Sequence, residues 1–323
     1  MLRNLIFWLS TKKRITDAIA RHGMRRGFAR RFVAGETLAE AISPSTELCR
    51  AGRRVSLNQL GENVATPEEA HQSRDSYIAT LEALERAGLD GNISIKLTQL
   101  GLDLDRELCP SLTQEIAARA QALGRTIEID MEGSAYTEAT IEIFESVHRQ
   151  HGNAGLAIQA YLRRSQSDLE RLAPLSPKVR LVKGAYREPA AIAFQKKSEV
   201  DASYRRLLDL LLRPSDGGCF FTAIGTHDPE LVAYACGKVR EYGVPRERYE
   251  FQMLLGIRRD LQRQVFAEGH PLRVYVPWGT AWCPYFMRRL AERPANLWFV
   301  LRSLLADRSR AGQETQLTGS DTR

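Results

Sequence analysis

The sequence lacks the features that mark several common classes of protein. Its five cysteines are scattered with no Cys-x-x-Cys pair, which argues for reduced thiols in a cytosol-like compartment and against a structural zinc site. No apolar run approaches the roughly 20 residues needed to span a bilayer. The N-terminal stretch Met1–Ser10 has no small-residue cleavage site, so a secretory signal is not expected. A Gly-x-Gly-x-x-Gly fingerprint is absent, which counts against a Rossmann domain.

The charge of the chain is basic, with a formal net charge of +7. The basic residues are spread along the chain rather than gathered in one tract with interleaved aromatics, so we expect no nucleic-acid partner. Attraction to anionic lipid stays open, because the N-terminal apolar run is followed by Lys12-Lys13-Arg14. We expect this segment to pack on the rest of the protein, with membrane contact as the alternative. The expected location is therefore the cytoplasm, with peripheral contact at the inner face of the membrane left open.

Eight short β-like runs recur along the chain with helical stretches between them, and most carry polar residues near their ends. They are Arg54–Asn58, Ile93–Lys96, Thr126–Asp130, Leu156–Gln159, Val179–Lys183, Phe220–Ile224, Tyr249–Gln252 and Arg273–Val276. Eight β/α units in roughly 250 residues predict an α/β fold, a (β/α)8 TIM-type barrel whose active site lies at the carboxyl ends of the strands. We expect residues 1–50 to form an N-terminal helical extension, residues 51–308 the barrel, and residues 309–323 a disordered tail. Thr66 followed by Pro67 predicts a helix start.

Alternation within two of these runs predicts a charged pair inside the barrel. Ser94, Lys96 and Thr98 share one side of their strand, opposite the apolar side that should face the helices. By the same count Glu128 and Asp130 point inward from the next strand. Lys96 and Asp130 should therefore meet, because either charge buried alone would cost several kcal/mol. They either bind a charged ligand or form a structural ion pair at the barrel rim.

The last unit places two arginines near the start of a helix. Pro284 suits the first helical position, so Arg288 and Arg289 fall in the first turns, where positive side chains oppose the helix dipole. Two guanidinium groups there make a site for a carboxylate or a phosphate. Glu292 lies within one turn of both and can orient them. Ordinary surface pairing of these three residues is the alternative.

These segments together resemble one family. The chain resembles the proline dehydrogenases, FAD-dependent barrel enzymes, and most closely their monofunctional bacterial members, from about Val55 to Phe299. The resemblance is carried by Val55–Glu62, Ser94–Leu97, Ile129–Glu132, Gln159–Arg164, Arg180–Tyr186, Thr226–Asp228, Glu250–Leu254 and the Arg288-Arg289 helix. Each segment alone is weak, whereas eight in the family's order, one for each predicted unit, are specific.

The resemblance implies roles for individual residues. Asp130 and Arg180 match catalytic positions, with Arg180 near the flavin ring. The implied substrate-binding residues are Lys96, Tyr186, Leu254, Tyr275, Tyr285, Arg288, Arg289 and Glu292. The implied FAD-binding residues are Met131, Gln159, Arg180, Lys183, Gly184, Ala185, Thr226 and His227. No metal is expected. Taken one at a time, Gln159 and His227 fit structural roles better than functional ones, the tyrosines and Leu254 fit core packing, and a solvated charge is the alternative for Lys183; the family order of the segments reverses this preference.

The implied reaction is oxidation of L-proline to Δ1-pyrroline-5-carboxylate by hydride transfer from C5 to FAD, with electrons passed on to a membrane quinone. This is the first step of proline catabolism to glutamate. One alternative is a related flavin barrel that oxidises 4-hydroxyproline or a folate, although the bulk of Tyr275 disfavours a hydroxylated ring. Another is a non-catalytic basic binding module, which would hold no flavin and would bind with an affinity that falls steeply with salt.

Overall fold

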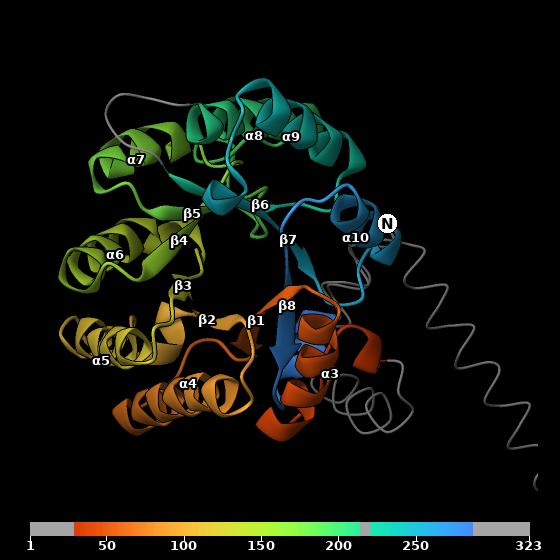
Figure 1. The fold of residues 1–323 in the computed structure, drawn as a ribbon. Helices are drawn as coiled ribbons and strands as arrows, with labels where there is room; N and C mark the ends of the chain where they lie inside the picture. The colour runs from red at the N-terminus through yellow and green to blue at the C-terminus, as the bar shows by residue number, and fades with distance from the viewer. Residues whose placement is uncertain (1–28, 214–219, 287–323) are drawn as a thin grey trace, which may run out of the picture.

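The protein forms a closed barrel of eight parallel strands. We describe a computed structural model of the 323-residue chain, in which residues 29–213 and 220–286 are described. The strands are β1 (Arg54–Gln59), β2 (Gly91–Ile95), β3 (Ile127–Ile129), β4 (Ala154–Gln159), β5 (Lys178–Val182), β6 (Phe221–Gly225), β7 (Tyr249–Leu254) and β8 (Leu272–Trp278). Each strand pairs in parallel with the next, and β8 pairs back with β1 (Figure 1). This confirms the predicted (β/α)8 barrel and all eight strands.

Helices surround the barrel as an outer ring (Figure 1). They are α3 (Leu38–Arg50), α4 (Pro67–Arg86), α5 (Leu108–Ala122), α6 (Thr137–His151), α7 (Ser165–Leu172), α8 (Lys197–Leu212), α9 (Pro229–Glu241) and α10 (Arg259–Ala267). Short 3-10 turns occur at η1 (Ala29–Arg31), η2 (Leu97–Leu100), η3 (Ser134–Tyr136), η4 (Ala173–Leu175) and η5 (Arg246–Arg248). None of the helices within the described ranges is long and apolar enough to cross a membrane.

The helix starts follow their capping residues. Thr66 is the N-cap of α4, as predicted, and its hydroxyl accepts a hydrogen bond from the amide of Glu69. Thr37 caps α3 in the same way and forms a capping box with Glu40. These side chains satisfy amide groups that have no partner inside the helix, which fixes where each helix begins.

The main hydrophobic core lies between the strands and the outer helices. Ile93 and Ile95 of β2 are fully buried on the side away from the barrel axis, as the alternation predicts. The barrel interior, by contrast, is rich in charged side chains, among them Glu128 and Glu250. The interior of this fold is usually filled by branched apolar side chains. Here ion pairs occupy part of it, so the interior is suited to polar chemistry.

The N-terminal segment closes on the end of β8. The amide of Ala34 donates to the carbonyl of Pro277, and the amide of Gly279 donates to the carbonyl of Gly35. The helix α3 then packs against β1 and β8. Residues 1–28 of the expected extension and the expected tail at 309–323 lie outside the described residues. The proposed boundary at residue 50 therefore stays a prediction.

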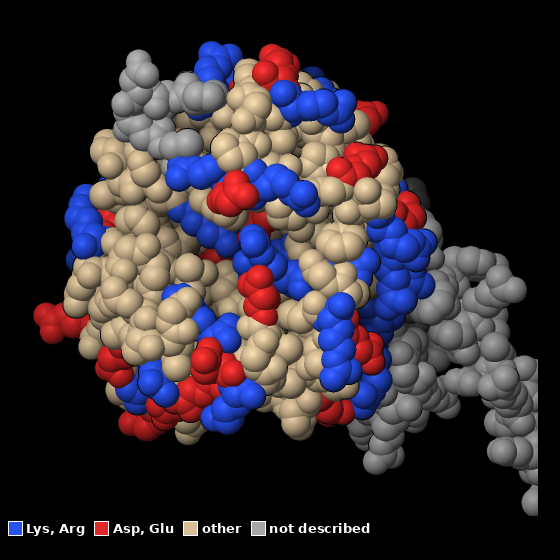
Figure 2. Space-filling view, viewed as in Figure 1, with Lys and Arg blue, Asp and Glu red and all other residues tan. Residues whose placement is uncertain are grey.

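The surface carries both signs of charge. On the face shown in Figure 2, Lys and Arg side chains are interspersed with Asp and Glu around a hollow near the middle of the view. On this face the positive charge therefore does not form one continuous stripe.

Candidate active site

Asp130 is the centre of a cluster of polar side chains. It follows β3 directly, and Lys96 follows β2 directly, so both lie at the carboxyl ends of neighbouring strands. The Lys96 Nζ atom lies 2.8 Å from Asp130 Oδ2, and the Tyr275 hydroxyl donates to the same oxygen at 3.0 Å. Arg180 Nη1 donates to Asp130 Oδ1 at 2.8 Å. The pair predicted from alternation is thus formed, and two further side chains join it.

Buried charges fix the protonation states of this cluster. Burial alone would raise the pKa of Asp130, but Lys96 and Arg180 hold the pKa of its carboxyl below the usual value. Burial works against the charge of Lys96 as well, yet Asp130 keeps the pKa of the ammonium well above its ordinary value. Burial and the charge of Asp130 raise the pKa of Tyr275. At neutral pH the cluster therefore holds one carboxylate, two cations and one neutral phenol.

A second group of charges lies deeper in the barrel. Glu250 of β7 accepts from Arg273 Nε at 2.8 Å and from Lys178 Nζ at 2.9 Å. Lys178 also lies 2.6 Å from Glu128, which in turn binds Arg180. We did not single out Lys178, Glu250 or Arg273 from the sequence. The available signal was their place within predicted strands, since a charge that faces the interior must find a partner.

Most of the other predicted residues lie along the rim of the barrel. Gln159 ends β4, Lys183 follows β5, Thr226 follows β6, and Leu254 ends β7. His227 Nε2 accepts the amide hydrogen of Leu254 at 2.9 Å, which places the ring proton on Nδ1. A predicted cofactor residue and a predicted substrate residue are thereby joined. The rim position of all these residues agrees with the place where this fold carries active sites.

Gln159 ties the segment after β5 to the segment after β3. Its side chain donates to the carbonyl of Glu132 at 2.8 Å and accepts from the amide of Ala185 at 3.3 Å. Gly184 has a φ of +119°, and a Cβ atom there would lie 2.2 Å from the ring of Tyr161. Only glycine fits this position without strain. Met131, another predicted cofactor residue, is buried beside Asp130 in the chain.

Lys183 is held by carboxylates from two helix starts. Its Nζ atom lies 2.5 Å from Asp201 in α8 and 2.8 Å from Asp228, the N-cap of α9. Burial would raise the pKa of Asp228, but Lys183 and Lys197 lower it to about 2. The predicted lysine is therefore part of an ordered ion cluster and is not a solvated charge.

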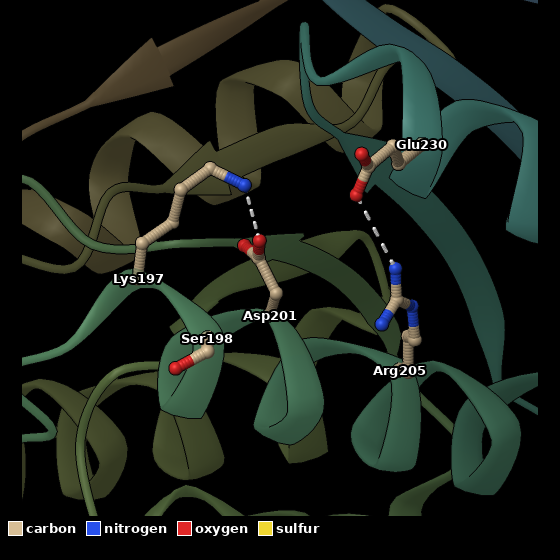
Figure 3. Close-up of a pocket in the computed structure, with 5 residues that line it drawn as sticks. All are labelled: Lys197, Ser198, Asp201, Arg205 and Glu230. Atoms are coloured by element: carbon tan, nitrogen blue, oxygen red, sulfur yellow. Dashed lines mark hydrogen bonds and ion pairs between the residues drawn. The ribbon is translucent and has the colours of Figure 1, made fainter.

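A surface pocket of about 410 Å³ adjoins this cluster. It is lined by Lys197, Ser198, Asp201, Arg205 and Glu230 (Figure 3). Figure 3 shows Lys197 pointing toward Asp201 and Arg205 toward Glu230, so both signs of charge face the pocket. Because Asp201 also binds Lys183, the pocket is connected through one carboxylate to the predicted cofactor site.

Only some of the remaining predicted substrate residues lie within the described part of the chain. Tyr186 is half-buried, and burial together with the charge of Glu62 raises the pKa of its hydroxyl. Tyr285 is buried in the segment after β8, where Trp282 donates to Glu36 at 2.9 Å. Arg288, Arg289 and Glu292 lie outside the described residues. Their role in binding a carboxylate stays a prediction.

One group of potential metal ligands occurs within the described part of the chain. Single ligand atoms of Cys236, Glu268 and His270 lie within 4.8 Å of one another, and His270 Nδ1 bonds to the Tyr249 hydroxyl at 2.8 Å. Burial, together with Arg240 and Arg246, lowers the pKa of His270 against the effect of Glu268. We assign no metal to this group.

Comparison with known proteins identifies the family. The family model for proline dehydrogenase matches residues 41–302. Proline dehydrogenase 1 of Bacillus subtilis subsp. natto is 39% identical over 305 residues, which is 94% of this chain and 99% of the relative. Proline dehydrogenase of Deinococcus radiodurans is 39% identical over 282 residues, covering 86% of this chain and 90% of the relative.

A solved structure agrees in fold. Proline utilization A from Bdellovibrio bacteriovorus, inactivated by N-propargylglycine, superposes with a TM-score of 0.76 at 23% identity. The match covers 82% of this chain and 32% of that one, so the present chain corresponds to about a third of the larger protein. With the family model and the bacterial relatives, which match over almost their whole length, in agreement, the chain belongs to the proline dehydrogenase family.

Proposed function

We propose that this chain oxidises L-proline to Δ1-pyrroline-5-carboxylate with FAD as the hydride acceptor, the first step of proline catabolism to glutamate. The observation that carries the proposal is the cluster of Lys96, Asp130, Arg180 and Tyr275 at the carboxyl end of the barrel. A carboxylate, two cations and a phenol ring suit a small zwitterionic substrate that is oxidised beside a flavin.

On the substrate side, the proposal assigns charge and shape to separate groups. Lys96 stays protonated and attracts the carboxylate of proline, together with Arg288, Arg289 and the supporting Glu292. Apolar surface for the ring methylenes is assigned to Leu254, Tyr186, Tyr275 and Tyr285. Holding both ends of a small rigid molecule fixes the direction of its C5–H bond, which makes hydride transfer effectively unimolecular.

The cofactor residues fit a flavin nucleotide. The proline dehydrogenase family is flavin-dependent, and when bound the flavin accepts a hydride. The residues proposed to hold FAD are Met131, Gln159, Arg180, Lys183, Gly184, Ala185, Thr226 and His227. The fit rests on chemistry present in this chain: Arg180 of β5 is a buried cation beside Asp130, and Lys183, which directly follows the same strand, is a second cation paired with Asp201 and Asp228. Cations suit a ring that becomes anionic on reduction and a pyrophosphate that is anionic throughout.

The amine of proline must lose a proton before hydride can leave. The lowered pKa of Asp130 makes it a weak base, and the raised pKa of Tyr275 keeps the phenol protonated. Neither group is therefore suited to take the proton at neutral pH. We assign this step to solvent, and we assign to Asp130 and Arg180 the task of holding fixed charge beside the reacting atoms.

We propose that the electrons leave to a membrane quinone, from a cytoplasmic protein that makes peripheral contact with the inner face of the membrane. The net charge of +7 supports attraction to anionic lipid. The apolar and basic N-terminal stretch that would make this contact lies outside the described residues.

An absorbance spectrum of the purified protein under anaerobic conditions tests the proposal. We expect flavin bands that bleach on addition of L-proline. If the bands persist with L-proline but bleach with 4-hydroxy-L-proline or a reduced folate, the compound that bleaches them is the substrate in place of proline. A protein that shows no flavin bands even after incubation with FAD would contradict the cofactor, and salt-dependent binding without flavin would indicate a non-catalytic module.

The substitution Lys96→Met adds a test of the substrate site. Losing a hydrogen bond to a charged group costs about 1.5–3 kcal/mol, so half-bleaching should require roughly 10- to 100-fold more proline. Lys238→Met is the matched control, because Lys238 pairs with the exposed Glu241 on α9 and should leave the titration unchanged. Equal effects of the two substitutions would contradict the role of Lys96.

A further inference from the structure

Arg180 is held on almost all of its donor groups. Its Nε atom donates to Glu128 at 2.8 Å, and its Nη2 atom donates to Glu128 and, at 2.6 Å, to Ser94. Its Nη1 atom donates to Asp130 at 2.8 Å. A guanidinium carries five N–H donors, so these contacts leave one Nη1 hydrogen without a partner among the described residues. The free donor is on the nitrogen beside Asp130, which is the side of the rim cluster.

Glu128 fixes the opposite edge of that guanidinium. It lies two residues before Asp130 on β3, and its side chain is 1% exposed. Lys178 lies 2.6 Å from its Oε1 atom, where Gln252 donates at 2.9 Å and Asn92 at 3.3 Å. Its Oε2 atom accepts from Arg180. Both carboxylate oxygens are therefore engaged, and neither can turn without breaking a contact to the barrel wall.

The charge of Glu128 is also fixed. Burial would raise the pKa of this carboxyl, but Arg180 and Lys178 bring it down to about 2. Glu128 is thus ionised throughout the working range of pH, and it binds Arg180 with two charge-assisted hydrogen bonds. A side chain held in this way keeps a single orientation, which is the condition for a preorganised site.

We propose that Glu128 is a positioning residue for the reaction: it holds the Arg180 guanidinium so that its remaining Nη1 hydrogen is kept for the cofactor. The inference rests on the proposed function, in which Arg180 contacts the flavin. It adds a residue that touches neither substrate nor cofactor and acts through Arg180 alone. Asp130 cannot replace it, because Asp130 is shared with Lys96 and Tyr275 and binds only one edge of the guanidinium.

Glu250 supplies a matched control inside the same barrel. It is as buried as Glu128, with a side chain 0% exposed, and it too binds Lys178 and Gln252. Its other partners are Arg273 at 2.8 Å and Arg54 at 3.4 Å, and it forms no hydrogen bond or ion pair with Arg180 or Asp130. Replacing either glutamate leaves buried cations short of a partner and should lower stability. Of the two substitutions, only that of Glu128 removes a direct partner of Arg180.

The test compares Glu128→Gln and Glu250→Gln in the full-length, FAD-loaded protein. We expect Glu128→Gln to lower kcat for proline by about 10-fold or more while KM changes by less than about 3-fold, because Lys96 and Tyr275 stay on Asp130. For Glu250→Gln we expect both constants to stay within about 3-fold of wild type. Thermal unfolding of both variants should show a lowered Tm, which separates loss of stability from loss of rate.

Other results would overturn the inference. Equal losses of kcat in the two variants would make the role of Glu128 merely structural, and a rise in KM with unchanged kcat would assign it to substrate binding. If Glu128→Gln does not fold, Glu128→Asp keeps the charge but is one methylene shorter, so it withdraws the single oxygen that accepts from both Nε and Nη2. An unchanged kcat in that variant would contradict positioning. If proline does not reduce the wild-type protein, the proposed function is wrong. This measurement needs no variant, so it is separate from the test of Glu128.

Discussion

At the scale of single residues, Asp130 shows how one carboxylate can organise a site. It accepts from Lys96, Arg180 and Tyr275, and from the Ser94 hydroxyl at 3.3 Å. Groups that share one acceptor in a poorly hydrated interior are coupled, so a change to any of them shifts the others. Substitutions in this cluster should therefore not be additive, and double-mutant cycles are the appropriate way to measure them.

Gly184 gives a prediction at the same scale. Its φ of +119° and the 2.2 Å approach of a built Cβ to the Tyr161 ring leave no room for a side chain. We expect Gly184→Ala to destabilise the protein by about 1–3 kcal/mol from the backbone alone, with more from displacement of the ring. Urea unfolding followed by circular dichroism measures the change.

Gly237 is the control for that substitution. It lies exposed in the interior of α9, with no atom within 4 Å of a built Cβ, so Gly237→Ala should stabilise the protein by about 0.5–1 kcal/mol. If both alanine variants moved the urea midpoint in the same direction, steric exclusion at Gly184 would be the wrong explanation.

At the scale of elements, the helix α4 offers a test of how a sequence signal sets a boundary. The Thr66 hydroxyl accepts from the amide of Glu69 at 3.3 Å. Thr66→Ala should therefore cost about 1 kcal/mol of unfolding free energy, whereas Thr66→Ser, which keeps the oxygen, should cost much less. Chemical denaturation of the two variants side by side measures the difference, and an equal loss would show that the cap contributes nothing.

The strands and part of the site were predictable from local pattern. Alternation places Lys96 and Asp130 on the inward side of adjacent strands, and adjacent strands put them in contact. The partners of Lys183 could not be found in this way. Asp201 and Asp228 come from the starts of α8 and α9, and their meeting depends on how two loops are folded over the barrel rim.

The deeper ion pairs needed the register of the closed barrel. The contact between Glu128 and Arg180 joins β3 to β5 across the interior, and that between Glu250 and Lys178 joins β7 to β5. Neighbour pairing along the chain does not predict which charges meet across the axis, because strand tilt decides which side chains share a layer. The resemblance to a family identified Arg180, but not the glutamate that holds it.

At the scale of the whole molecule, the ion-paired carboxylates predict that stability depends strongly on pH in the acidic range. The pKa values of Glu128 and Asp228 are lowered to about 2, and that of Glu250 is also lowered. Because the pKa values of these carboxyl groups are lower in the folded protein than in the unfolded one, they stabilise the fold at pH values above their unfolded pKa of about 4. That stability is lost as pH falls from about 5 toward 2.

We therefore expect the urea midpoint to hold near neutral pH and to fall steeply below about pH 5, with each carboxylate adding up to about 1.4 kcal/mol per pH unit to the slope. Glu132, whose pKa is raised by burial, works in the opposite sense and softens the fall. The variant Glu250→Gln lacks one titrating group and should show a shallower slope. An identical slope in that variant would contradict the assignment.

The pairing of β1 with β8 has to wait until most of the chain has been synthesised. Arg273 of β8 donates to the carbonyl of Val55 in β1 at 2.8 Å, across 218 residues of chain. At about 5–20 residues per second a ribosome needs roughly 10–45 s to supply that partner. During this interval the edge of β1 that later pairs with β8 is unpaired, so it is exposed to pairing with a strand of another chain that is being synthesised on the same messenger RNA. When β8 pairs with β1, it also brings the Tyr275 hydroxyl within hydrogen-bond distance of Asp130. The open edge of β1 is therefore covered in the same step that completes the cluster of Lys96, Asp130, Arg180 and Tyr275.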